Sequence, residues 1–122
     1  MAITLNHTIV AAYDRVESAA FYARIFGFEA PSTQSAFSVV RVNDSLTLDF
    51  ANTERFDPQH YAFKVSEQEF DEIFARVLAE GIAYGSGPQS LTDGQINHNF
   101  NGRGVYFCDA NGHVLEILTR DA

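Results

Sequence analysis

The chain has 122 residues, of which 46% are hydrophobic and 20% charged. These values are typical of one folded domain and exclude a disordered, collagen-like or coiled-coil chain. Sixteen acidic and eight basic residues give a formal charge of −8, which disfavours binding to nucleic acid or to anionic membranes. A single cysteine, Cys108, and the lack of a signal peptide or membrane-spanning run predict a cytoplasmic protein without an internal disulfide.

The first half of the sequence predicts a strand, a helix and then further strands. Residues 3–10 are apolar and β-branched, which indicates a strand, and His7 lies among them. An acidic capping pattern that starts at Asp14 predicts a helix, and Gly27 is expected to end it. Two more strands are expected at residues 37–42 and 46–51.

The second half of the sequence predicts the same order of elements. His60 lies in an apolar segment expected to form a strand over residues 60–65. Ser66, three residues before a glutamate, predicts a helix that Gly81 ends. Two strands, at residues 105–108 and 113–119, are expected to form a hairpin around Asn111-Gly112.

This repetition predicts an internal duplication. His7 and His60, like the two helix-ending glycines, are separated by almost the same number of residues. We therefore expect an α+β protein of two tandem β-α-β-β-β modules, about residues 1–53 and 54–122. A half of this size is too small to be comfortable alone, so both modules are expected to form a single domain.

Three polar residues in the predicted strands are candidate metal ligands, namely His7, His60 and Glu116. A polar side chain among buried apolar residues is costly unless it is paired or ligated. Taken singly, each histidine is expected to be a hydrogen-bonded core residue, and Glu116 to face solvent. Taken together, two imidazoles and one carboxylate suit Fe, Mn, Zn or Ni ions and leave coordination positions open for a substrate.

Three segments, LNHTIV, PQHYAFKV and GVYFCDANGHVLEILT, resemble the vicinal oxygen chelate superfamily. This superfamily includes glyoxalase I, fosfomycin-resistance, bleomycin-resistance and extradiol dioxygenase proteins, and the resemblance covers the whole chain. It implies that the paired modules form a cupped mixed sheet around one divalent metal ion. It also implies that His7, His60 and Glu116 bind the metal and that the protein is a homodimer.

The resemblance assigns further roles within the superfamily. The segment around His60, together with Tyr106, is most similar to the fosfomycin-resistance transferases. Ile9 stands where those enzymes have a threonine, and Lys64 is the only lysine, so a phosphonate substrate is not expected. Asp49 lies where glyoxalase I carries a fourth ligand, a glutamate. Its expected role is ligand, general base or ordinary polar strand residue.

The long segment of residues 85–104 predicts a functional loop, because it carries little secondary-structure signal. We expect it to act as a lid in which Arg103 holds an anionic oxygen and His98 or Tyr106 moves a proton. The alternative is a solvated flap whose polar residues have no catalytic role. His113, next to the predicted turn, is expected at the surface rather than in the site.

These observations predict a divalent-metal-dependent enzyme of the glyoxalase or dioxygenase type. Its small substrate would bind the metal through neighbouring oxygens, and the reaction would be that of a lyase or isomerase, a thiol transferase or a ring-cleaving dioxygenase. The alternative is a metal-free drug-binding protein of the bleomycin-resistance type, for which a buried, unmetallated glutamate would be a cost without a use. A third hypothesis is an accessory protein with a vestigial site.

Overall fold

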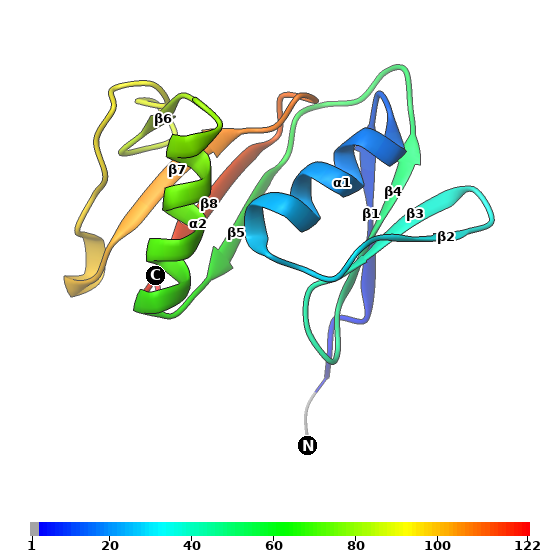
Figure 1. The fold of residues 1–122 in the computed structure, drawn as a ribbon, viewed down its shortest axis with the longest axis horizontal. Coiled ribbons are helices and arrows are strands. Elements are labelled where there is room, and N and C mark those ends of the chain that lie inside the picture. Colours follow the sequence, from blue (N-terminus) through cyan, green and yellow to red (C-terminus); the bar gives the residue numbers. More distant parts are fainter. Residues whose placement is uncertain (1–2) are drawn as a thin grey trace. The chain divides into compact units, whose positions relative to one another are not determined.

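The computed structural model describes residues 3–122. The chain forms two compact units, and the boundary along the chain lies between Asp57 and Pro58. Each unit has one α-helix and one four-stranded sheet (Figure 1). The elements are therefore those of an α+β protein with tandem β-α-β-β-β modules, as the sequence predicts. No helix among the described residues is both long enough and apolar enough to cross a membrane.

Unit 1, which ends at Asp57, begins with a strand that pairs in parallel with the last strand of the unit. Its sheet has the order β1-β4-β3-β2, and the other pairings are antiparallel. In chain order its elements are β1 (His7–Ala12), α1 (Arg15–Phe26), β2 (Ser32–Gln34), β3 (Phe37–Arg41) and β4 (Thr47–Asn52).

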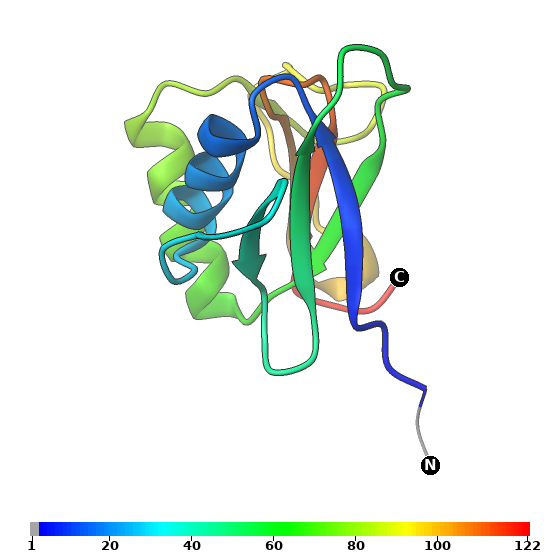
Figure 2. The same cartoon turned by 90° about the vertical axis from the view of Figure 1, so that its right-hand side faces the viewer.

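Local signals define the ends of α1. The Asp14 carboxylate accepts hydrogen bonds from the amides of Val16 and Glu17, and Gly27 ends the helix with a φ of 77°. The helix lies along one face of the sheet (Figure 2), and the rings of Tyr22 and Phe50 meet edge to face at 4.8 Å. The opposite face of this sheet carries no helix of unit 1.

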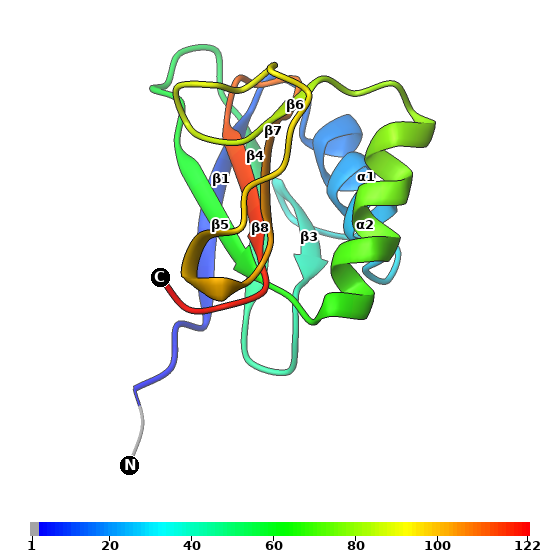
Figure 3. The ribbon, with the colours of Figure 1, turned by 90° about the vertical axis from the view of Figure 1, so that its left-hand side faces the viewer.

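Unit 2, which begins at Pro58, repeats this arrangement. The sheet order is β5-β8-β7-β6, with β5 parallel to β8 (Figure 3). Its elements are β5 (His60–Lys64), α2 (Glu67–Ala79), β6 (Tyr84–Gly85), the short 3-10 helix η1 (Asn99–Asn101), β7 (Gly104–Cys108) and β8 (Val114–Leu118).

The capping box predicted at the start of α2 is confirmed. The Ser66 hydroxyl accepts from the Glu69 amide, and the Glu69 carboxylate accepts from the Ser66 amide. Phe70, Ile73 and Val77 form the buried side of the helix, which lies over one face of the unit 2 sheet (Figures 1 and 3). As in unit 1, the other face of the sheet is free of the unit's own helix.

Two predictions about local structure are wrong. The first strand spans His7–Ala12 instead of residues 3–10, so His7 begins the strand rather than lying within it. The reason is pairing, because β1 can only extend as far as its partner β4, which begins opposite His7 at Thr47. His113 is fully buried rather than at the surface, since it precedes β8 in a turn that folds back on itself and does not follow the strand alternation.

Candidate functional site

The helix-free face of the unit 2 sheet brings two predicted ligands together. Ala62 of β5 pairs with Glu116 of β8, so His60, two residues before Ala62, has its side chain on the same face as Glu116. His60 Nε2 lies 2.9 Å from Glu116 Oε1. The imidazole is 46% exposed and the carboxylate 13%. The Glu116 carboxylate is therefore largely buried on this face of the sheet, while the His60 imidazole remains accessible to solvent.

Tyr106 lies on the same face, because it pairs directly with Glu116 across β7 and β8. Its ring centroid is 5.7 Å from that of His60. Burial, together with the negative charge of the Glu116 carboxylate, raises the pKa of Tyr106 to about 12. At neutral pH the phenol consequently keeps its proton and is a hydrogen-bond donor in this site, not a base.

The His60–Glu116 pair has the chemistry of two metal ligands. Metal–nitrogen and metal–oxygen bonds of about 2.0–2.2 Å place two ligand atoms at right angles, as in an octahedral site, about 3 Å apart, and the observed separation is 2.9 Å. Within the described residues of either unit, no three His, Cys, Asp or Glu side chains gather into a metal-binding group. The donor set of unit 2 thus fits a metal ion but supplies two ligands, not three.

Unit 1 carries the counterpart of this pair on its own helix-free face. Asp49 of β4 pairs with Ile9, two residues after His7, so it occupies the position that Glu116 occupies in unit 2. Here the carboxylate does not meet the histidine. Asp49 Oδ1 accepts a hydrogen bond of 2.9 Å from Thr47 Oγ1, while His7 Nδ1 lies 2.7 Å from Asn6 Oδ1.

Arg103 is bound to the carboxylates of α2. Its Nε donates to Glu67 Oε1 and its Nη1 to Asp71 Oδ1, both at 2.8 Å. The guanidinium carbon lies 4.3 Å from the centre of the Phe70 ring. Hydrogen bonds from Thr119 and Arg103 lower the pKa of the Glu67 carboxyl. In this structure Arg103 fastens the loop to α2, and its expected role as an anion ligand stays a prediction.

The loop between β6 and β7, residues 86–103, is held together by its own polar groups. Asp93 Oδ1 accepts from the amides of Ser86 and Gln95, each at 3.0 Å. Asn97 Nδ2 donates to the Ser86 carbonyl, and the Asn97 and Gly104 main chains exchange two hydrogen bonds. His98 is exposed, directly before η1. The loop is therefore an organised segment, and its role as a lid stays a prediction.

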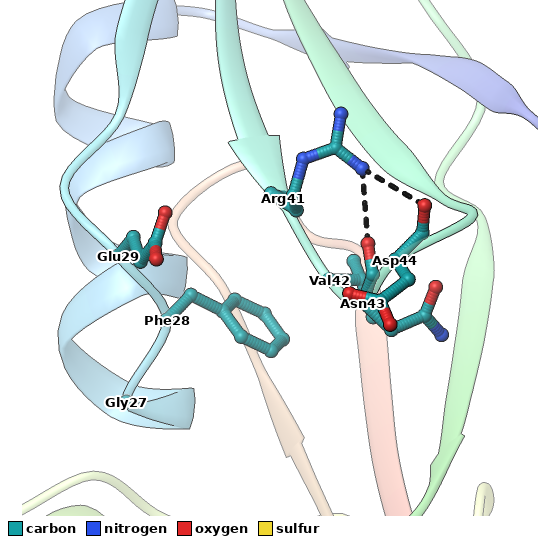
Figure 4. A pocket seen from close by; sticks show the side chains of 7 residues that line it. All are labelled: Gly27, Phe28, Glu29, Arg41, Val42, Asn43 and Asp44. Carbon is teal, nitrogen blue, oxygen red and sulfur yellow. Dashed lines mark hydrogen bonds between the residues drawn. The ribbon is translucent and has the colours of Figure 1, made fainter.

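A separate pocket lies in unit 1, with a volume of about 250 Å³ (Figure 4). Arg41 extends over it and donates from Nη1 to the carbonyls of Asn43 and Asp44. The candidate ligands and catalytic residues are not part of its lining. The lining residues are Gly27, Phe28, Glu29, Arg41, Val42, Asn43 and Asp44.

Several known proteins are similar to this chain in sequence or in fold. No protein-family model matches the sequence. A solved structure named oxidase ChaP-H1 is 49% identical, with 98% of each chain covered and a TM-score of 0.94. The metallothiol transferase FosB of Lysinibacillus sphaericus (strain C3-41) is 25% identical over 122 residues, which cover 95% of this chain and 82% of FosB. A glyoxalase/dioxygenase from Nostoc punctiforme, 22% identical, shares the fold with a TM-score of 0.72, over 98% of this chain and 92% of its own.

Proposed function

The chain belongs to the vicinal oxygen chelate superfamily, and from this we propose that it is a divalent-metal-dependent enzyme acting on a small oxygen-bearing molecule. The observation that carries the proposal is the 2.9 Å approach of His60 Nε2 to Glu116 Oε1. Both atoms lie on a sheet face without a helix, where a carboxylate beside an imidazole is suited to bind a cation.

The proposed ligands are His7, His60 and Glu116. Unit 2 supports two of them by geometry, and the third is carried over from the resemblance, which gives both modules a histidine at the start of the first strand. Two nitrogen donors and one carboxylate are typical of iron and manganese sites with open coordination positions. When bound, such a metal acts as a Lewis acid for a substrate that chelates it through neighbouring oxygens.

The protein's own groups have distinct parts in this proposal. Glu116 is held inside the sheet and presents its carboxylate to His60, which keeps the imidazole oriented. Tyr106 keeps its proton at neutral pH, since its pKa is about 12. It is therefore suited to donate a hydrogen bond to an oxygen that gains negative charge during the reaction. Asp49, bound to Thr47, is proposed as polar lining rather than as a fourth ligand.

We propose oxidation as the reaction class, with dioxygen as the oxidant. The support is the name oxidase given to a relative with 49% identity over nearly the whole chain. Transfer of a thiol, the activity in the FosB name, is the second candidate, and its support is the weaker identity of 25%. An anionic phosphonate substrate is not proposed, because the single lysine, Lys64, is paired with Asp121 at 2.8 Å. The three relatives named above are enzymes, and their names give no support to the drug-binding alternative.

We also propose that both modules belong to one domain and that the protein is a homodimer. The support for the dimer is the superfamily, in which dimers are common, and the support for one domain is the small size of each module. Size-exclusion chromatography with light scattering measures the mass in solution. A monomer at all concentrations would contradict the dimer.

The test of the function is metal content and metal affinity. We expect one divalent ion per chain in the wild type and loss of binding in His7→Ala, His60→Ala and Glu116→Ala. His98→Ala is the matched control, because it removes an exposed histidine outside the proposed ligand set. Oxygen consumption with catechol-type substrates, measured on the iron- and manganese-loaded protein, tests the reaction class. Retention of the metal by the Glu116→Ala variant would refute the proposed site.

A further inference from the structure

A buried histidine outside the proposed ligand set contacts the main chain beside His60. His113 is 0% exposed and lies in the turn between β7 and β8. We propose that His113 is a positioning residue. It fixes the proposed metal ligand His60 by binding the main chain of the preceding residue, Gln59. The inference rests on the proposed metal site, because it assigns a role to the surroundings of one ligand.

The contact runs through Gln59, the residue before His60. The Gln59 amide donates to His113 Nδ1 at 2.9 Å, and the Gln59 carbonyl accepts from the Val114 amide, also at 2.9 Å. Two consecutive residues, His113 and Val114, therefore hold both polar main-chain groups of Gln59. Acceptance at Nδ1 requires that this nitrogen carry no proton.

The main chain of His113 is itself held in place by the turn. Asp109 Oδ1 accepts from the amides of His113 and Asn111, both at 2.9 Å, and Asn111 Nδ2 donates to Asp109 Oδ2. The ring of Tyr61 meets the imidazole edge to face at 5.4 Å. Because Asp109 and Asn111 are also buried, this network is shielded from water and fixes the main chain that carries the His113 ring.

The need for such a hold follows from the position of His60. It is the first residue of β5, and the β5–β8 pairing begins with His60 opposite Val114. Strand ends fray, because the ladder supports them on one side only. A small rotation at this end would move His60 Nε2 away from Glu116. The hydrogen bond from Gln59 to His113 extends the ordered region by one residue beyond the ladder.

The start of β1 in unit 1 corresponds to the start of β5 in unit 2, but unit 1 has no histidine at the position that corresponds to His113. The Asn6 carbonyl accepts from the Thr47 amide at 3.0 Å, as the Gln59 carbonyl accepts from Val114. The residue before Thr47 is Leu46, however, which has no acceptor on its side chain. A side-chain acceptor at this position is thus present in unit 2, the unit in which the histidine reaches the carboxylate, and not at the corresponding position of unit 1.

The experiment compares two substitutions at one position. His113→Leu fills the space but removes the acceptor, and we expect its metal dissociation constant to rise about tenfold, the low end of what changes around metal ligands cost. His113→Asn restores an oxygen close to the position of Nδ1, and we expect it to regain an affinity within about threefold of the wild type. Val77→Ala, a buried change in α2, controls for loss of stability alone.

Two measurements on the metal-free protein separate this inference from the proposed function. Hydrogen exchange at the Gln59 amide is expected to accelerate in His113→Leu and to stay slow in His113→Asn. The NMR resonances of the His60 ring are expected to shift in His113→Leu only. A wild type that binds no metal would refute the proposed function while these two measurements still decide the inference. Unchanged His60 resonances, or equal metal affinity in His113→Leu and Val77→Ala, would overturn the inference.

Discussion

The two units share one backbone plan but arrange their polar residues differently. Asp49 and Glu116 occupy equivalent register positions, because each pairs with the residue two positions after the histidine that opens the neighbouring strand. In unit 2 the carboxylate reaches His60, whereas in unit 1 it bonds to Thr47. The residue at the Thr47 position in unit 2 is Val114, which offers no hydroxyl. The carboxylate that meets its histidine therefore differs from the one that does not by one methylene and one neighbouring hydroxyl.

The connections before the third strands of the two units also differ. In unit 1, β2 and β3 are joined by Ser35 and Ala36 alone. In unit 2, residues 86–103 separate β6 from β7, and Arg103 ties the end of this loop to α2. The long connection occurs in the unit with the His60–Glu116 pair. The two units thus share the sheet order, while unit 2 carries a longer polar connection.

The largest expected effect comes from exchanging the lengths of the two carboxylates. Glu116→Asp withdraws the carboxylate from His60 by one methylene, and we expect metal affinity to fall about a hundredfold, as for the strongest changes close to a metal. Asp49→Glu is the matched change in unit 1, and we expect it to alter affinity by less than about threefold. Isothermal titration with the divalent metal measures both. A tenfold gain in Asp49→Glu would show that unit 1 is poised to supply a fourth ligand.

A second prediction concerns Tyr106, whose counterpart opposite Asp49 is Val39. The folded pKa of about 12 exceeds the ordinary value of 10.0, so between these pH values the unfolded chain loses the proton that the folded chain retains. Stability from this group is therefore intact below pH 10 and decreases as pH rises towards 12. We expect the wild type to lose about 2–3 kcal/mol relative to Tyr106→Phe over this range.

Urea unfolding at several pH values measures that difference. Tyr13→Phe, which removes the hydroxyl of an exposed ring in unit 1, is the control for the loss of a hydroxyl. Parallel stability curves for the wild type and Tyr106→Phe would show that the Glu116 carboxylate and burial do not act on this phenol.

The smallest expected effect comes from exchanging the residues that lie opposite the two histidines. Val114→Thr gives Glu116 the hydroxyl partner that Asp49 has in unit 1, and competition with His60 is expected to weaken metal binding about two- to tenfold, the equivalent of one hydrogen bond. Thr47→Val is the reciprocal change and is expected to leave metal affinity as it is. Metal titration of both variants checks this. An unchanged affinity in Val114→Thr would mean that side-chain length alone separates the two carboxylates.

The sequence by itself determined the features that depend on neighbouring residues. Asp14 and Ser66 start the helices, Gly27 ends the first, and the repeated order of elements identifies the tandem modules. These are short-range effects, in which a side chain bonds to an amide two or three residues away. The alternation of β8 likewise places Glu116 on the face opposite Leu115 and Ile117, which are buried.

Only the tertiary structure decided which polar groups meet. The start of β1 at His7, the binding of Arg103 to the α2 carboxylates and the burial of His113 all depend on residues distant in the chain. Sequence alternation assigns a face to a strand residue but not its partner, because strand register and the packing of turns choose among several polar neighbours on that face. The sequence therefore predicts His60 and Glu116 as ligands of one site, and the pairing of β5 with β8 brings their side chains together.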